Sequence, residues 1–178
     1  MYKFNKSAGF SLLEVIITVT IVAFLAAIAI PNFKAWTQNT KIRTAAESLQ
    51  AGIQKARAEA LTRNAQVQFV LGANSAWTVG CPTVTATCPA VIEQRAATEG
   101  STDTVIVTPT PAGTTTVAFG NLGTRVTNAA DFTRLDLDIS TSILSAAESR
   151  ELRVTVGTSG NARMCDPEFT YPANPRGC

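Results

Sequence analysis

The sequence predicts an α+β fold in which a long N-terminal α-helix packs on a C-terminal antiparallel β-sandwich head. Three observations predict this fold: an unbroken apolar run near the N-terminus, an amphipathic helical pattern directly after it, and many short strand patterns in the remaining chain. We therefore expect a short N-terminal segment at 1–9, a helix at 10–64 and a β-rich head at 65–178. A head of this length is sufficient for one domain of ordinary size.

The apolar run extends from Leu12 to Ile30. Its nineteen residues would form about 28 Å of helix, which is close to the hydrocarbon thickness of a bilayer. The run therefore predicts a transmembrane segment at 12–30, with the lipid bilayer as partner. Glu14 lies near the start of this segment, and an ionised Glu in hydrocarbon costs about 2.5–3.5 kcal/mol. We expect its carboxylate to need a compensating partner.

Residues 31–64 continue the helix with an amphipathic pattern. Pro31 removes one backbone hydrogen bond, so we expect a helix kink or local melting of the helix there. Beyond it, apolar side chains recur at spacings of three and four, which places them on one helix face: Ile42, Ala46, Leu49, Ile53, Ala56 and Ala60. Charged residues occupy the positions between them. This apolar face is expected to pack on the head, and Asn64 is a suitable end for the helix.

The rest of the chain has the pattern of short antiparallel strands with turn residues between them. We expect strands at 67–71, 77–79, 105–107, 115–119, 134–139, 152–156 and 162–165. In 134–139 apolar and charged residues alternate, which is typical of a half-buried strand. The stretch from Thr98 to Thr116 is rich in Thr and Pro, and we interpret most of it as an exposed loop.

Composition and charge argue against catalysis and against strong nucleic-acid binding. The formal net charge is +2, and without Lys3 and Lys6 the basic and acidic side chains balance. The chain has no histidine, so the commonest general base and metal ligand is missing. Asp136 and Asp138 resemble a Ca²⁺-binding pair, but with Arg134 beside them we interpret them as a solvated strand face. We expect no catalytic residue, no metal and no cofactor.

The N-terminal motif resembles the processing site of type IV prepilins and type II secretion pseudopilins. Gly9 and Phe10 stand after a short basic stretch, and Glu14 and the apolar helix follow them. The resemblance implies that residues 1–9 are a prepilin leader, that a prepilin peptidase cuts between Gly9 and Phe10, and that Phe10 becomes N-methylated. It also implies that the Glu14 carboxylate meets the free N-terminal amine of a neighbouring subunit during assembly.

Two other interpretations of the N-terminus remain. An ordinary secretory signal peptide could be cleaved at an A-x-A-like site, for which Ala27-Ile28-Ala29 is a candidate. Its apolar core would be longer than the usual ~7–15 residues and would contain Glu14, which disfavours this interpretation. The second is a plain single-span anchor in which Glu14 has no role.

The C-terminal part narrows the resemblance to one branch. Gly160 and Arg163 precede Cys165 in a Gly-x-x-Arg-x-Cys pattern, and together with the β-rich head this is similar to the GspH/FimT/FimU family. The resemblance implies a pilin-like minor pilin, anchored in the inner membrane by a single span with its head in the periplasm. Such a subunit would join a type IV pilus, which serves twitching motility and adhesion, or a type II secretion pseudopilus. Its partners would be the major pilin, other minor pilins and the inner-membrane assembly platform.

The four cysteines indicate disulfides. An even number in an exported head is typical of disulfide pairing, and the spacing between the cysteines does not fit a structural zinc site. Three connectivities are open, and proximity alone favours the two local bridges, Cys81–Cys88 and Cys165–Cys178.

A third role is that of a DNA receptor of a competence pilus. Some DNA-uptake minor pilins of this branch carry a Gly-Arg-x-Arg motif in the C-terminal hairpin. The matching stretch here, from Gly160 to Arg163, has only the second arginine. Arg176 and Arg153 are the other candidates for DNA contact, and we expect that contact to be weak.

Overall fold

The structure is a computed structural model that describes residues 10–99, 103–127 and 131–178. It begins with the helix α1 (Leu12–Arg63). Nine strands follow in the described residues: β1 (Val67–Leu71), β2 (Trp77–Gly80), β3 (Glu93–Arg95), β4 (Val105–Thr110), β5 (Thr116–Phe119), β6 (Arg125–Val126), β7 (Arg134–Ile139), β8 (Leu152–Val156) and β9 (Ala162–Cys165). The chain divides into two compact units, Met1–Trp36 and Thr37–Cys178. A long helix and antiparallel sheets confirm the predicted α+β fold.

Local interactions define both ends of α1. At the start, the Ser11 hydroxyl accepts a hydrogen bond from the Glu14 backbone N–H at 3.2 Å, which is the geometry of an N-cap. At the end, Asn64 takes a left-handed conformation with φ of 50°, and the Ala65 N–H bonds back to the Ala60 carbonyl at 3.3 Å. Asn tolerates this conformation better than most residues, so the helix stops where the sequence indicated.

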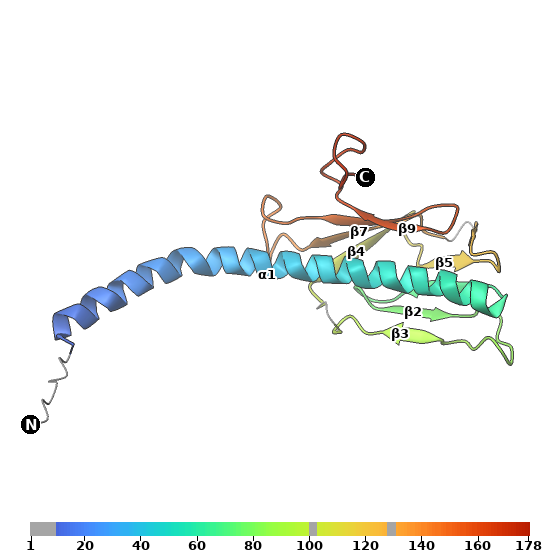
Figure 1. Cartoon of the computed structure of the whole chain (residues 1–178), viewed down its shortest axis with the longest axis horizontal. Helices are drawn as coiled ribbons and strands as arrows, with labels where there is room; N and C mark the ends of the chain where they lie inside the picture. The colour runs from blue at the N-terminus through green and yellow to red at the C-terminus, as the bar shows by residue number, and fades with distance from the viewer. Residues whose placement is uncertain (1–9, 100–102, 128–130) are drawn as a thin grey trace, which may run out of the picture. The chain divides into compact units, whose positions relative to one another are not determined.

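The strands of the second unit form two antiparallel sheets. The order is β3-β2-β1-β5-β6 in the five-stranded sheet and β4-β7-β8-β9 in the four-stranded sheet. In β7, the side chains of Leu135, Leu137 and Ile139 are buried while the charged residues between them are half-buried, as the alternation predicted. The Phe132 ring meets the Phe69 ring edge-on at a centroid distance of 5.9 Å, so it connects β1 to the segment entering β7. Figure 1 shows β2 and β3 below the C-terminal half of α1, and β4, β7 and β9 above it.

The apolar face of α1 packs on the head as predicted. All six expected residues are fully buried: Ile42, Ala46, Leu49, Ile53, Ala56 and Ala60. Gly52 belongs to the same face and allows an especially close approach, because a Cβ built there would lie 2.9 Å from carbon atoms of Phe69 and Trp77. The glycine therefore serves the contact between the helix and the sheet.

The strand expected at 105–107 is present but longer than predicted. Val105–Thr110 forms β4 and pairs with β7 over six residues, so the strand extends into a Thr- and Pro-rich stretch that we expected to be mostly loop. Pro109 fits because β4 lies at the edge of its sheet, where a missing backbone N–H is tolerated. The short strands β3 and β6 were not predicted, since stretches of three and two residues carry no detectable alternation.

Candidate functional site

Of the residues of the predicted processing and assembly site, Phe10 precedes α1 and Glu14 lies in its first turn. Gly9 and the 1–9 leader lie outside the described residues. Phe10 is exposed, and two residues later α1 begins. Ser11, which the sequence analysis did not single out, caps the helix. Its signal was present in the sequence, because Ser followed three residues later by Glu is a capping-box pattern.

Glu14 places an exposed carboxylate in an otherwise apolar surface. Its neighbours Leu12, Leu13 and Val15 are all exposed in the single chain. A negative charge in the first helical turn interacts favourably with the positive end of the helix dipole, but in hydrocarbon this does not replace a counter-ion. The arrangement can therefore bind a cation presented by another molecule in the plane of the membrane.

The other polar side chains of this segment are satisfied within the helix. The Thr18 hydroxyl donates to the Val15 carbonyl at 2.9 Å, and the Thr20 hydroxyl lies 2.8 Å from the Ile17 carbonyl. Such local hydrogen bonds allow Ser and Thr to occupy a lipid-facing helix without an unpaired polar group. By its length and composition, α1 is long and apolar enough to cross a membrane. The two threonines thus need no partner outside the helix.

The helix remains continuous through Pro31. The side-chain amide of Asn32 donates a hydrogen bond to the Ile28 backbone carbonyl at 3.0 Å, one turn back along the helix. The local melting that the proline could cause does not occur, and the predicted kink remains a prediction.

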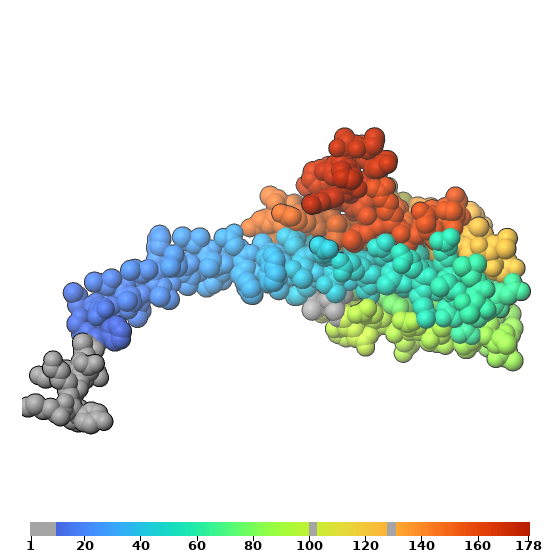
Figure 2. Space-filling model, in the orientation of Figure 1, coloured from blue at the N-terminus to red at the C-terminus, as the bar shows by residue number. Residues whose placement is uncertain are grey.

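Both local cysteine pairs are joined in the structure, Cys81 to Cys88 and Cys165 to Cys178. The first loop lies against the end of α1, where the Arg63 guanidinium donates to the Thr87 carbonyl at 2.5 Å. The second bridge holds the chain's C-terminus against the end of β9. Figure 2 shows this C-terminal segment, in red, projecting from the surface of the head.

The three arginines considered for DNA contact have different surroundings. Arg153 and Arg163 lie on the same face of the β8–β9 pair. Arg153 is opposite Cys165 in the register, and Arg163 precedes Cys165 by two residues in β9, so the side chains of both arginines are on the same side of the sheet. Arg153 is paired with Asp136. The Arg163 guanidinium donates to the Gly177 carbonyl at 3.0 Å and lies 5.0 Å from the centre of the Tyr171 ring. The Arg163 guanidinium thus uses N–H groups to hold the C-terminal loop, so fewer of them are available to bind a phosphate.

Arg176 is exposed, and its backbone N–H is held by the Asn174 side chain at 3.0 Å. Gly160, the first residue of the compared motif, has a structural explanation. It has φ of +81°, and a Cβ there would collide with the Gly123 carbonyl, which already accepts a hydrogen bond from Arg57 at 3.0 Å. The glycine thus lets the β8–β9 turn approach the β5–β6 turn and α1, so it does not indicate DNA binding.

The two aspartates of β7 are engaged by protein groups. The Asp138 carboxylate accepts hydrogen bonds from the Ser149 hydroxyl at 2.6 Å and from the Ile139 backbone at 2.7 Å. Among the described residues, no group of three or more His, Cys, Asp or Glu side chains is arranged to hold a metal ion. Nearby, burial and then the negative charges of Asp138 and Asp136 raise the pKa of Glu151.

Glu59 on α1 shows the opposite shift. Burial would raise its pKa, but hydrogen bonds from Arg63 and Lys55 outweigh this effect, so the pKa is lowered overall. The Arg63 Nε lies 2.7 Å and the Lys55 Nζ 3.2 Å from the Glu59 carboxylate. This ion pair lies near the end of α1, where the cations also interact favourably with the helix dipole.

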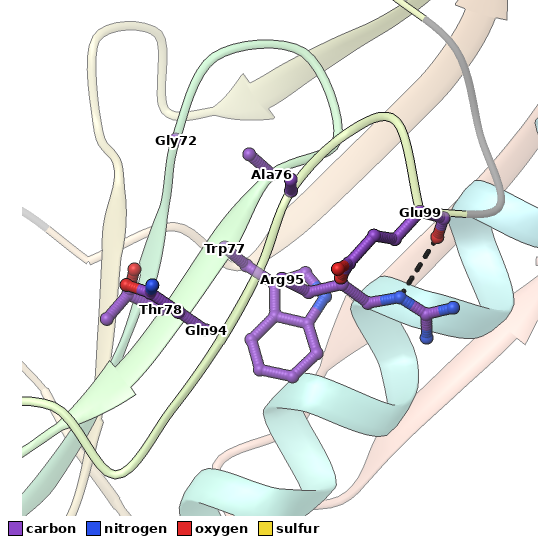
Figure 3. Close-up of a pocket in the computed structure, with 8 residues that line it drawn as sticks. Gly72, Ala76, Trp77, Thr78, Gln94, Arg95 and Glu99 are labelled. Carbon is purple, nitrogen blue, oxygen red and sulfur yellow. Dashed lines mark hydrogen bonds between the residues drawn. The ribbon is translucent and has the colours of Figure 1, made fainter.

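A shallow pocket of about 350 Å³ lies beside β2 and β3 (Figure 3). It is lined by Gly72, Ala76, Trp77, Thr78, Gln94, Arg95, Ala96 and Glu99. The Arg95 side chain spans this lining, and its Nε donates to the Glu99 carbonyl at 3.0 Å. The lining contains the Thr78 hydroxyl and the Glu99 carboxylate but no histidine, so it lacks the commonest general base of a hydrolytic site.

Comparisons with known proteins agree with the N-terminal motif and the fold. The family model described as "Type II transport protein GspH" matches residues 45–160. The model described as "Prokaryotic N-terminal methylation motif" matches residues 4–30. No curated protein matches the chain.

Two solved structures are similar to the chain, both of the type IV minor pilin FimU from Pseudomonas aeruginosa. The first has a TM-score of 0.51 and 16% sequence identity, with 75% of this chain and 95% of that chain covered. The second crystal form has a TM-score of 0.47 and 17% identity, covering 71% of this chain and 94% of that chain. The first likeness shows a common fold.

Proposed function

Since this chain belongs to the family described as type II transport protein GspH, we propose that it is a minor pilin that helps to prime a type IV pilus and then joins it. The family consists of structural, non-enzymatic pilins and pseudopilins. The observation that carries the proposal is Glu14, an exposed carboxylate in the first turn of an apolar helix, within the stretch that the methylation motif matches. The fold shared with FimU supports a place in a pilus.

The proposed mechanism begins with processing of the precursor. The prepilin peptidase cuts between Gly9 and Phe10, which removes the basic leader and creates a new amine at Phe10. That amine is N-methylated. A glycine before the cut suits this step, because the peptidase can approach its backbone without meeting a Cβ.

Assembly then pairs charges that are costly in the bilayer. The Glu14 carboxylate of one subunit meets the N-terminal amine of its neighbour, so that each charge compensates the other in a medium where both are poorly solvated. The amine at Phe10 exists only after cleavage. Processing therefore controls entry into the filament.

The proposed location is the inner membrane, with a single span and the head in the periplasm. Two disulfides in the head fit an oxidising compartment. The proposed partners are the prepilin peptidase, the major pilin, other minor pilins and the inner-membrane assembly platform.

The alternative is a minor pseudopilin of a type II secretion system, which the name of the matching family favours. Deletion of the gene in its own host separates the two roles. Loss of surface pili with normal protein secretion supports the pilus role, and the reverse result supports the pseudopilus role. Complementation with Glu14→Ala should fail, whereas complementation with the wild-type chain should succeed.

A further inference from the structure

An exposed aromatic pair follows the apolar run of α1. The rings of Phe33 and Trp36 have a centroid distance of 5.7 Å and an interplanar angle of 36°. The side chains are 65% and 64% exposed in the single chain. Both residues belong to the first compact unit, Met1–Trp36. Two large aromatic side chains on one helix surface require an environment that suits an apolar ring.

The position of the pair along the helix identifies that environment. At roughly 1.5 Å per residue, Phe33 and Trp36 lie about 5 and 9 Å beyond Ile30, the last residue of the apolar run. The polar region on each side of the hydrocarbon core is about 5–8 Å thick. When the apolar run spans the core, Phe33 therefore lies within the headgroup layer and Trp36 at its outer edge.

The chemistry of the neighbouring residues agrees with this depth. Trp is enriched at membrane–water interfaces because its ring is apolar while its N–H needs a polar partner. Lys34 lies between the two aromatic residues, and its exposed side chain can reach phosphate with its ammonium group. Asn32 introduces the first amide after the apolar run, so the change from apolar to polar side chains occurs within one helical turn.

We propose that Phe33 and Trp36, with Lys34 between them, form an interfacial anchor that fixes the end of the apolar helix in the headgroup layer of a phospholipid bilayer. The inference rests on the proposed membrane-inserted precursor. It adds a specific depth: the anchor opposes sliding of the helix in either direction, because the rings would leave the interface for hydrocarbon or for water. Glu14 is then held near the opposite side of the hydrocarbon core, about 24 Å away from Ile30 along the helix.

Tryptophan fluorescence tests this depth directly, because the chain has only two tryptophans. The full chain is reconstituted into vesicles of phosphatidylcholine and phosphatidylglycerol that carry a nitroxide either near the headgroup or near the end of the acyl chain. Trp77→Phe leaves Trp36 as the only reporter. Trp36→Phe leaves Trp77, which is 4% exposed in the head and serves as the matched control.

We expect the headgroup-proximal nitroxide to quench Trp36 at least twofold more strongly than the deep nitroxide, and neither to quench Trp77. Stronger quenching of Trp36 by the deep probe, or by neither probe, overturns the inference. The second result would mean that the pair faces water or protein. If Trp77→Phe does not fold, the difference between the wild type and Trp36→Phe supplies the Trp36 signal.

A positional swap provides a second test. The triple variant Phe33→Trp, Trp36→Phe, Trp77→Phe moves the reporter three residues, or about 4.5 Å, towards the hydrocarbon. The quenching ratio should shift towards the deep probe, and an unchanged ratio contradicts an upright helix held at this depth. Flotation of the vesicles on a density gradient shows whether the chain is inserted in the membrane. A chain that floats with the vesicles but fails the quenching tests refutes only the anchor. A chain that does not float with them contradicts the proposed function as well.

Discussion

The indole N–H of Trp77 donates a hydrogen bond to the Ser48 hydroxyl at 2.9 Å, which joins strand β2 to helix α1 inside the head. Both side chains are buried, so the bond is shielded from water. The same indole lies over Gly52, where no side chain intervenes. Ser48 and Gly52, one turn apart on the helix, thus leave space for the Trp77 side chain, which is the largest side chain of β2.

Ser48→Ala should destabilise the head, because it leaves the buried indole N–H without its partner, at a cost of about 1–3 kcal/mol. Trp77→Phe alone should also destabilise it, but adding Ser48→Ala to Trp77→Phe should cost less than Ser48→Ala costs in the wild type. Urea unfolding of the full chain in detergent micelles, followed by circular dichroism, measures this coupling. Thr62→Ala is the control, since the exposed Thr62 hydroxyl bonds only within its own helix turn. Strict additivity of the two changes would contradict the shared bond.

The sequence predicted the elements that carry a long periodic signal. The apolar run, the stripe on α1 and the alternation in β7 each repeat often enough to define a face. Ser48 lies on the buried face but is polar, so periodicity could not assign it there. Its burial depends on Trp77, which is 29 residues away in the sequence, and a single sequence does not reveal such a pairing.

The site was predictable to a similar extent. The motif identified Phe10 and Glu14 as candidate site residues. It did not identify Ser11 as the helix cap, although the spacing between Ser11 and Glu14 is that of a capping box. The environments of Arg163 and Gly160 depend on contacts with the C-terminal loop and with the β5–β6 turn. Those contacts form only in the folded head, so the sequence motif alone predicted neither the partners of Arg163 nor the structural role of Gly160.

The disulfide pairing can be checked by non-reduced peptide mapping. We expect peptides that link Cys81 to Cys88 and Cys165 to Cys178, as the structure joins them across sequence separations of 7 and 13. Loop-closure entropy gives each bridge about 2.5–3 kcal/mol of stabilisation, so replacing both cysteines of one pair by alanine should lower stability by a comparable amount. A cross-link between the two pairs would contradict this connectivity.

The Glu59 ion pair makes a pH-dependent contribution. Because the pKa of Glu59 is lowered in the folded state, its stabilising effect is present above the unfolded-state pKa and is lost as pH falls through the folded-state pKa. Glu59→Gln should therefore lower the unfolding free energy at neutral pH, by about 1 kcal/mol or less, and have no effect once the wild-type carboxylate is protonated. Glu47→Gln is the control, since its pair with Arg43 is largely exposed and should contribute little. An equal loss for Glu59→Gln at neutral and at acid pH would refute the electrostatic explanation.

DNA binding by the head should be weak. Non-specific binding depends on the number of phosphates neutralised, and Arg153 and Arg163 are already engaged by Asp136 and by the C-terminal loop. We expect the soluble part from Lys34 onward to bind duplex DNA no more tightly than about 10⁻⁴ M at physiological salt.

The double variant Arg163→Ala, Arg176→Ala should change this affinity by less than twofold. A Lys41→Gln, Arg43→Gln variant controls for binding by the basic helix. Micromolar affinity that disappears in the Arg163→Ala, Arg176→Ala variant would instead support a DNA receptor.

The mass of the mature N-terminus tests the central claim, that this chain is a processed pilin subunit. We predict that the chain purified from host membranes begins at an N-methylated Phe10, while a Gly9→Leu variant accumulates as the full-length precursor. Intact mass spectrometry with N-terminal sequencing distinguishes these species. A wild-type chain that begins at Met1, or that has been cut after Ala29 as a secretory signal peptide would be, contradicts the account.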